Sequence, residues 1–139
     1  MKRTLKHAEK KRLLSEITDR LTELCPDLVA AYVFGSFISA DAFSDMDLGL
    51  LFSENPSKPL LLELDLETEL ERTTACPVDV RVLNGAPLSF VQSVIRTGEV
   101  IVDVDPNRRA DFEGLILKKY FDFAPFRARY LAEVTNAPL

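Results

Sequence analysis

Two stretches, LVAAYVFGS at residues 28–36 and SDMDLGLLF at residues 44–52, decide how this chain folds. The first is an almost continuous apolar run that stops at Gly35-Ser36, which is typical of a strand buried on both faces. In the second, side chains of a strand would alternate, so Asp45 and Asp47 share one face and leucines occupy the other. We therefore expect two buried strands, one ending in a tight turn and the other opening with a pair of carboxylates.

A third strand is predicted at Val78–Leu83, where Asp79 and Arg81 fall on one face and valines on the other. Both acidic strands thus offer an apolar face to helices and a carboxylate face to solvent. The α-carbons of Asp45 and Asp47 would be roughly 7 Å apart, so their side chains can converge on ions of the two-metal type. Hard oxygen ligands of this kind suit Mg²⁺ or Mn²⁺.

The turn at Gly35-Ser36 offers groups for the other half of such a site. Glycine permits close backbone approach, and backbone N–H groups with a serine hydroxyl can hold a phosphate. Phosphate donors beside bound metal are what phosphoryl-type transfer needs, and Asp79 can complete the metal shell or accept a proton. Gly-Ser alone is a common turn and Asp-x-Asp alone is usually a solvated strand end. Their combination with a later lone aspartate is much more specific. Arg81, on the same face as Asp79, can equally steady a carboxylate, approach a bound phosphate compound or be a plain surface residue.

The remaining elements follow from periodicity and from helix-ending residues. We predict helices over residues 4–24, 59–73 and 87–97, a short strand over 100–104, and a final helical region that Pro125 kinks or restarts. The fold class is α/β, with a small mixed sheet, helices on one face and the active site on the other. We expect one domain over 1–139, with an N-terminal helix at about 4–24, a catalytic core at about 25–105 and a C-terminal helical region at about 106–135.

The composition of the chain excludes several classes of function and of catalytic residue. The 139 residues are 47% hydrophobic and 28% charged, with no run of about 18 apolar residues for a bilayer and no visible signal peptide, so we expect a cytoplasmic protein. Net charge is −5, which argues against direct nucleic-acid binding. His7 is the single histidine, so acid–base and metal chemistry must use carboxylates, and Cys25 and Cys76 are expected to be small buried hydrophobes. Six cations crowd the first twelve residues, either as a solvated helix end or as a contact for phosphate or an acidic partner.

Taken together, these motifs resemble the minimal nucleotidyltransferase (MNT) family of the polymerase-β superfamily. The likeness spans roughly residues 25–132 and rests on these segments: Tyr32-Val33-Phe34-Gly35-Ser36-Phe37, Ser44-Asp45-Met46-Asp47-Leu48, Val78-Asp79-Val80, Leu83-Asn84-Gly85-Ala86-Pro87, Thr97-Gly98-Glu99, Arg109-Ala110-Asp111-Phe112-Glu113 and Tyr120-Phe121-Asp122-Phe123. The resemblance implies a polymerase-β-like nucleotidyltransferase fold.

The resemblance also implies roles and partners. Ser36, in the turn with Gly35, would bind nucleotide phosphate, whereas the three aspartates would hold Mg²⁺ or Mn²⁺ and carry catalysis. Arg81 lies outside the matched motifs and is a further candidate for nucleotide binding because of its place on the Asp79 face. The implied reaction transfers AMP from ATP to a hydroxyl, with release of pyrophosphate. Members of the family often act as antitoxins beside a HEPN-type toxin, where they adenylylate a toxin tyrosine and bind the toxin.

Two departures from the family pattern keep alternatives open. The spacer between Ser36 and Asp45 holds eight residues, which is short for the family, and Ile38-Ser39-Ala40 replaces the usual Ala-Arg-Gly. The loop over the phosphates therefore lacks a cation of its own. The alternatives are an antitoxin that neutralises its partner mainly by binding, and a small-molecule nucleotidyltransferase, although the latter usually carries a further substrate domain.

The C-terminal region is rich in aromatic residues, which either fill the core around a terminal helix or form an interface. They are Phe112, Tyr120, Phe121, Phe123, Phe126 and Tyr130. The sequence leaves both interpretations open, as it does the choice between a homo-oligomer and a hetero-oligomer.

Overall fold

A computed structural model describes residues 3–4, 7–39, 42–43 and 45–136 of the chain. Its elements, in chain order, are β1 (Arg3–Thr4), α1 (His7–Leu24), β2 (Leu28–Phe34), α2 (Ser36–Ser39), β3 (Ala42–Phe43), β4 (Met46–Phe52), α3 (Pro59–Thr74), β5 (Val78–Val82), α4 (Leu88–Thr97), β6 (Glu99–Asp103) and α5 (Pro106–Asn136). The predicted helices and strands are all present, with α1 beginning three residues later than expected. The short elements β1, α2 and β3 were not predicted.

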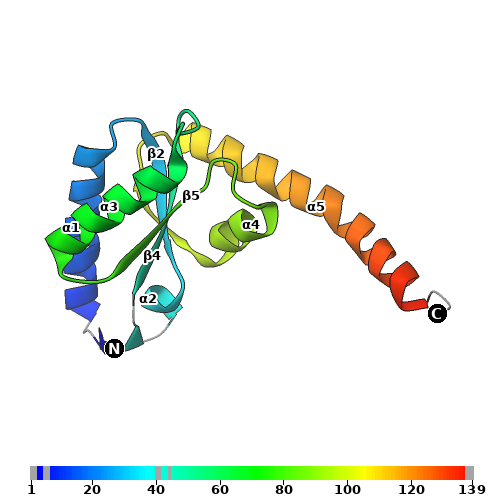
Figure 1. Ribbon diagram of the computed structural model, residues 1–139, viewed down its shortest axis with the longest axis horizontal. Helices are drawn as coiled ribbons and strands as arrows, with labels where there is room; N and C mark the ends of the chain where they lie inside the picture. The colour runs from blue at the N-terminus through cyan, green and yellow to red at the C-terminus, as the bar shows by residue number, and fades with distance from the viewer. Residues whose placement is uncertain (1–2, 5–6, 40–41, 44, 137–139) are drawn as a thin grey trace.

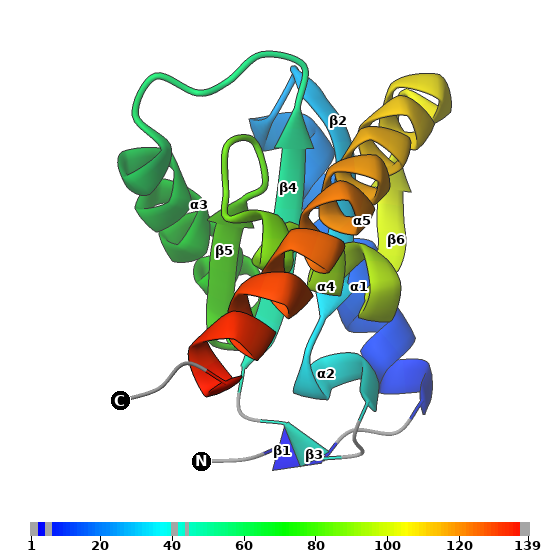
Figure 2. The same cartoon turned by 90° about the vertical axis from the view of Figure 1, so that its right-hand side faces the viewer.

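The main sheet has four strands in the order β5-β4-β2-β6 (Figure 2). Strand β4 runs parallel to β5 and antiparallel to β2, and β2 is antiparallel to β6. The α3 helix supplies the crossover that a parallel β4–β5 pair requires. This mixed four-stranded sheet with helices confirms the predicted fold class.

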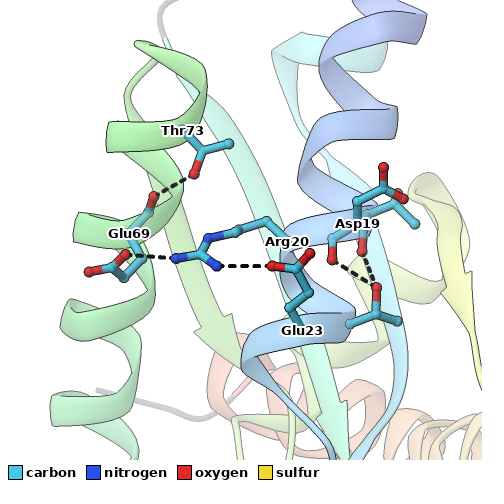
Figure 3. Close-up of polar contacts among 7 residues, drawn as sticks. Asp19, Arg20, Glu23, Glu69 and Thr73 are labelled. Carbon is cyan, nitrogen blue, oxygen red and sulfur yellow. Dashed lines mark hydrogen bonds and ion pairs between the residues drawn. The ribbon is translucent and has the colours of Figure 1, made fainter.

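One face of the sheet carries the larger core, beneath α1 and α3. Leu13, Ile17 and Leu21 of α1 are buried there, and so are Leu66 and Leu70 of α3. At the outer surface, Arg20 of α1 joins the two helices, because its guanidinium lies 3.1 Å from Glu69 of α3. The same guanidinium lies 3.0 Å from Glu23 of its own helix (Figure 3). The packing follows directly from the helical spacing of the leucines and isoleucine.

The other face is not free of helices, which corrects the expectation of helices on one face only. Helices α4 and α5 lie on it (Figure 2), and Tyr32, Leu83, Val91, Val94 and Ile116 form a second buried cluster. A Cβ at Gly49 would come within 3.3 Å of Val94, so α4 packs closely only because β4 has a glycine there. The candidate site therefore shares its face with two helices.

The last helix, α5, is continuous from Pro106 to Asn136, so the helix does not end and restart at Pro125. Its first half packs on the sheet, where the Tyr32 hydroxyl donates to Glu113 at 2.6 Å and Arg109 binds the same carboxylate at 3.0 Å. Its second half extends away from the body (Figure 1). Among the C-terminal aromatics, Phe112 packs against the core and Phe121 is 65% exposed, whereas the side chains of Phe123, Phe126 and Tyr130 lie outside the described residues.

Candidate active site

The register of the central strands brings the predicted site residues to one end of the sheet. Phe34 pairs with Asp47, and Asp47 pairs with Asp79. Since β2 is antiparallel to the other two strands, its carboxyl end, with the Gly35 turn, meets the amino ends of β4 and β5. Residues separated by more than forty positions in the sequence thus become neighbours across three adjacent strands.

The turn at Gly35 requires glycine for two separate reasons. Its φ is +76°, a conformation that L side chains rarely adopt. A Cβ at this position would also overlap the Oδ2 atom of Asp47. The backbone turn after β2 and the carboxylate of β4 are consequently packed against each other, which is the close approach expected of a phosphate loop beside a metal-binding carboxylate.

Asp47 is the electrostatic centre of this group. Partial burial, with the neighbouring charges of Asp45 and Asp79, raises the pKa of Asp47 from 3.8 to about 6, and the Arg81 charge acts in the opposite direction. The Arg81 Nε lies 3.8 Å from Asp79 Oδ1, and both side chains are about half exposed, so this ion pair is weak. Arg81 thus lies beside Asp79, and the cluster keeps an excess of negative charge that a divalent cation would neutralise.

The donor set fits Mg²⁺ or Mn²⁺ in chemistry, since carboxylate oxygens are the preferred ligands of hard divalent cations. Within the described residues, however, no three or more His, Cys, Asp or Glu side chains are already arranged around one point as a closed set of ligands. The charges of Asp45 and Asp79 both act on Asp47, although the three side chains do not form such a set. These three side chains would therefore have to rearrange to hold a metal ion together.

Two features near the site could not be seen in the motifs. The first involves the short loop between Ser36 and Asp45. Strand β3 lies within this loop and pairs with the N-terminal strand β1, with Arg3 opposite Phe43 in the register. In addition, Lys10 of α1 donates a hydrogen bond from Nζ to the Phe37 carbonyl at 2.8 Å. The basic N-terminal segment is thus attached to the loop that lacks cations, a relation that only long-range pairing creates.

The second feature is a row of glutamates along the edge strand β5. Backbone N–H groups of alternate β5 residues donate to carboxylates placed four residues apart on α3, at distances of 2.8–3.0 Å: Val78 to Glu71, Val80 to Glu67 and Val82 to Glu63. A step of four helical residues is about 6 Å and a step of two strand residues is about 6.6 Å, so the two rows match. The glutamate spacing was visible in the sequence, but its partner row was not.

The cysteines play no part in this site. Cys25 and Cys76 are both buried, as predicted, and they form no disulfide with each other. Burial raises the pKa of Cys25 to about 11, so this thiol stays protonated and inert at neutral pH.

Comparison with known proteins places the chain in a family. The family described as "Polymerase beta, Nucleotidyltransferase" matches residues 15–107, which is more than half of the chain. The chain therefore belongs to the polymerase-β-like nucleotidyltransferases, and the resemblance drawn from its motifs is confirmed at this level. No curated protein sequence matches it significantly.

Solved structures of toxin–antitoxin pairs share its fold. One is a tri-AMPylated HEPN toxin of Shewanella oneidensis in complex with an MNT antitoxin: the match has 20% identity and a TM-score of 0.74, and it covers 91% of this chain and 98% of that one. A toxin–antitoxin structure with AMP-PNP matches at 20% identity and a TM-score of 0.74, over 88% of this chain and 98% of that one. A structure of the toxin–antitoxin pair MntA–HepT matches at 19% identity with a TM-score of 0.73, and the match covers 90% of this chain and 98% of that one.

Within the described residues, none of the helices combines the length and apolar character that crossing a membrane demands.

Proposed function

We propose that this chain is a metal-dependent protein adenylyltransferase that transfers AMP from ATP to a hydroxyl, a tyrosine hydroxyl in particular, of a HEPN-type toxin. It would thereby act as the antitoxin of a cytoplasmic pair and form a hetero-oligomer with its target. The proposal is supported by the chain's family and by its likeness to MNT antitoxin complexes. A toxin in one of those complexes is AMPylated and another complex holds an ATP analogue.

The observation that carries the proposal is the packing of Gly35 against Asp47, with Asp79 on the adjacent strand. This arrangement supports a site in which the Gly35 turn would bind phosphate, while Asp47 and Asp79, paired on adjacent strands, would hold the metal ion. Phosphoryl-type transfer relies on positioning and charge neutralisation, which is what such a site offers.

Each residue has a defined role in the proposed reaction. Ser36 and the backbone of the Gly35 turn bind the β- and γ-phosphates, and Asp45, Asp47 and Asp79 hold Mg²⁺ or Mn²⁺. When bound, the metal neutralises charge on the triphosphate and on the leaving pyrophosphate. The acceptor oxygen forms a bond to the α-phosphorus while the bond to pyrophosphate breaks, and the hydroxyl proton passes to Asp79.

Labelled ATP tests the proposal. The chain, Mg²⁺, ATP labelled at the α-phosphate and the protein encoded by the neighbouring gene are incubated together, and label on that protein is measured. We expect transfer by the wild type and by the control Asp65→Asn, whose side chain is exposed on α3. Asp47→Asn should lose at least about 100-fold in rate, because it removes both charge and metal affinity. Absence of transfer by the wild type, or full transfer by Asp47→Asn, contradicts the proposal.

A second candidate function is neutralisation by binding alone, favoured by the short loop between Ser36 and Asp45, which has no cation of its own. Cells that express the toxin with Asp45→Ala, Asp47→Ala antitoxin separate the two functions. If the double variant still protects them, binding is sufficient. If the complex forms but protection is lost, transfer is required.

A further inference from the structure

Two adjoining cavities form a groove along the outer edge of β5, which we call the β5 groove. The larger, about 440 Å³, is lined by residues that include Leu60, Glu63, Arg81, Ala86, Pro87 and Phe90. The smaller, about 290 Å³, is lined by residues that include Leu60, Leu64, Glu67 and Asp79. Because Leu60, Glu63 and Arg81 line both, the groove runs from the third carboxylate of the site toward α4.

This step rests on the proposed function. If that function is correct, the strand order indicates which reactant approaches along the groove. In-line displacement places the leaving pyrophosphate and the attacking hydroxyl on opposite sides of the α-phosphorus. The phosphate-binding turn follows β2, Asp47 lies on β4 with Asp45 directly before that strand, and β5 lies beyond β4. If the pyrophosphate leaves toward Ser36, the hydroxyl must approach from the β5 side, where the groove opens beside Asp79.

An exposed strand edge usually recognises a peptide by adding it as a further strand. That mode is blocked here, since the outward N–H groups of Val78, Val80 and Val82 are already bound by the α3 glutamates. Figure 2 shows α3 along the outer side of β5. Whatever occupies the groove is therefore recognised through its side chains.

The lining specifies the chemistry of those side chains. Leu60 and Leu64, one helical turn apart on α3, are 72% and 59% exposed, and Pro87 and Phe90 form the opposite apolar wall. Such contiguous exposed apolar surface marks an interaction site. Glu63, Glu67 and Asp79 also line the groove, against the single described cation Arg81, so its charge is negative.

We propose that the β5 groove docks the acceptor segment of the partner protein. The segment presents its hydroxyl at Asp79, seats an apolar side chain between Leu60 and Phe90, and places a basic residue near Glu63 and Glu67. The nucleotide stays on the β2 and β4 side. Selection of the acceptor thus belongs to α3, an element outside the catalytic motifs.

Leu61 supplies a matched control. It lies on the same helix and is 55% exposed, yet it lines neither cavity. With the neighbouring gene's HEPN-type protein as acceptor, Leu60→Asp and Leu64→Asp should each raise KM for that protein about tenfold, the scale of an interface hot spot. KM for ATP should stay within about twofold, because the nucleotide binds elsewhere. Leu61→Asp should leave both KM values unchanged.

Three results overturn the docking proposal. A rise in KM for ATP with unchanged KM for the acceptor assigns the groove to the adenosine moiety. If the variants change only the self-association of the chain, the groove is assigned to binding a second copy of the chain. Equal effects of Leu60→Asp and Leu61→Asp show that the groove has no special part.

A second measurement separates failure of docking from failure of the proposed function. If the wild type transfers no label, the proposed function fails, and the affinity of the two proteins is measured by calorimetry instead. Leu60→Asp should still weaken that complex about tenfold relative to Leu61→Asp. Where the wild type does transfer label, a photo-crosslinker at position 60, but not at 61, should attach to the partner segment that carries the modified hydroxyl. Attachment to a different segment overturns the proposal.

Discussion

Replacing Asp47 by asparagine should make the protein more stable at neutral pH, although it removes a site residue. Partial burial and two neighbouring carboxylates raise the pKa of Asp47 to about 6 in the folded chain, against an ordinary value of 3.8. The folded state therefore holds this proton more tightly than the unfolded state. Between pH 3.8 and about 6, the free energy of unfolding decreases as pH rises, and above pH 6 the whole cost of the charge is present.

The size of the effect follows from the shift. At about 1.4 kcal/mol per pKa unit, the shift corresponds to about 3 kcal/mol at most, and solvent screening of this partly exposed group reduces it to about 1–2 kcal/mol. Asparagine has nearly the same shape and no charge, so it removes the cost. For a chain of this length the melting temperature at pH 7.5 should rise by about 3–6 °C. At pH 4 the difference should nearly vanish, because the wild-type carboxyl is then protonated in the folded state.

Thermal and urea unfolding followed by circular dichroism, from pH 4 to pH 8 in EDTA, measures this difference. Asp65→Asn, an exposed substitution on α3, is the control and should follow the wild type at every pH. If Asp47→Asn has the same stability as the wild type at pH 7.5, or exceeds it equally at pH 4, the electrostatic reasoning is refuted. In a separate experiment without EDTA, added Mg²⁺ should stabilise the wild type more than Asp47→Asn, since the cation neutralises the same charges.

Three further predictions concern the structure around the site. Gly35→Ala should abolish most transfer activity and lower the free energy of unfolding by about 2 kcal/mol, because its Cβ would meet Asp47 in a strained backbone conformation. Glu67→Leu should cost about 1–3 kcal/mol in urea unfolding, since the N–H of Val80 loses its acceptor. Tyr32→Phe should cost about 1 kcal/mol and increase hydrogen exchange in the first half of α5, because the phenol is hydrogen-bonded to that helix.

Each of these predictions has its own check. Gly49→Ala, at a glycine without positive φ whose added Cβ would meet Leu83 and Val94 and no carboxylate, separates loss of activity from general loss of packing. Glu67→Gln keeps an acceptor oxygen and should retain most of the stability that Glu67→Leu loses. For Tyr32→Phe, a uniform rise in hydrogen exchange over the whole protein, without preference for α5, would contradict the local role.

The candidate site shows how far local patterns reach. Alternation along β4 and β5 was sufficient to place Asp47 and Asp79 on one face, because the direction of a strand side chain depends only on its position in the pattern. The glycine after a buried strand likewise indicated a close approach at Gly35. Which atom approaches it could not be deduced, since the approach to Asp47 Oδ2 depends on the register between β2 and β4.

The fold shows the same division. Helices, strands and their apolar faces were determined by the sequence itself, since hydrophobic period and helix-ending residues act over a few positions. The tertiary structure alone decided that α4 and α5 share the site's face, that the glutamates of α3 bind the edge of β5, and that the N-terminal segment pairs inside the short loop. Each of these contacts joins residues far apart in the chain. Such contacts arise only after the elements pack, because burial and register, not local preference, select their partners.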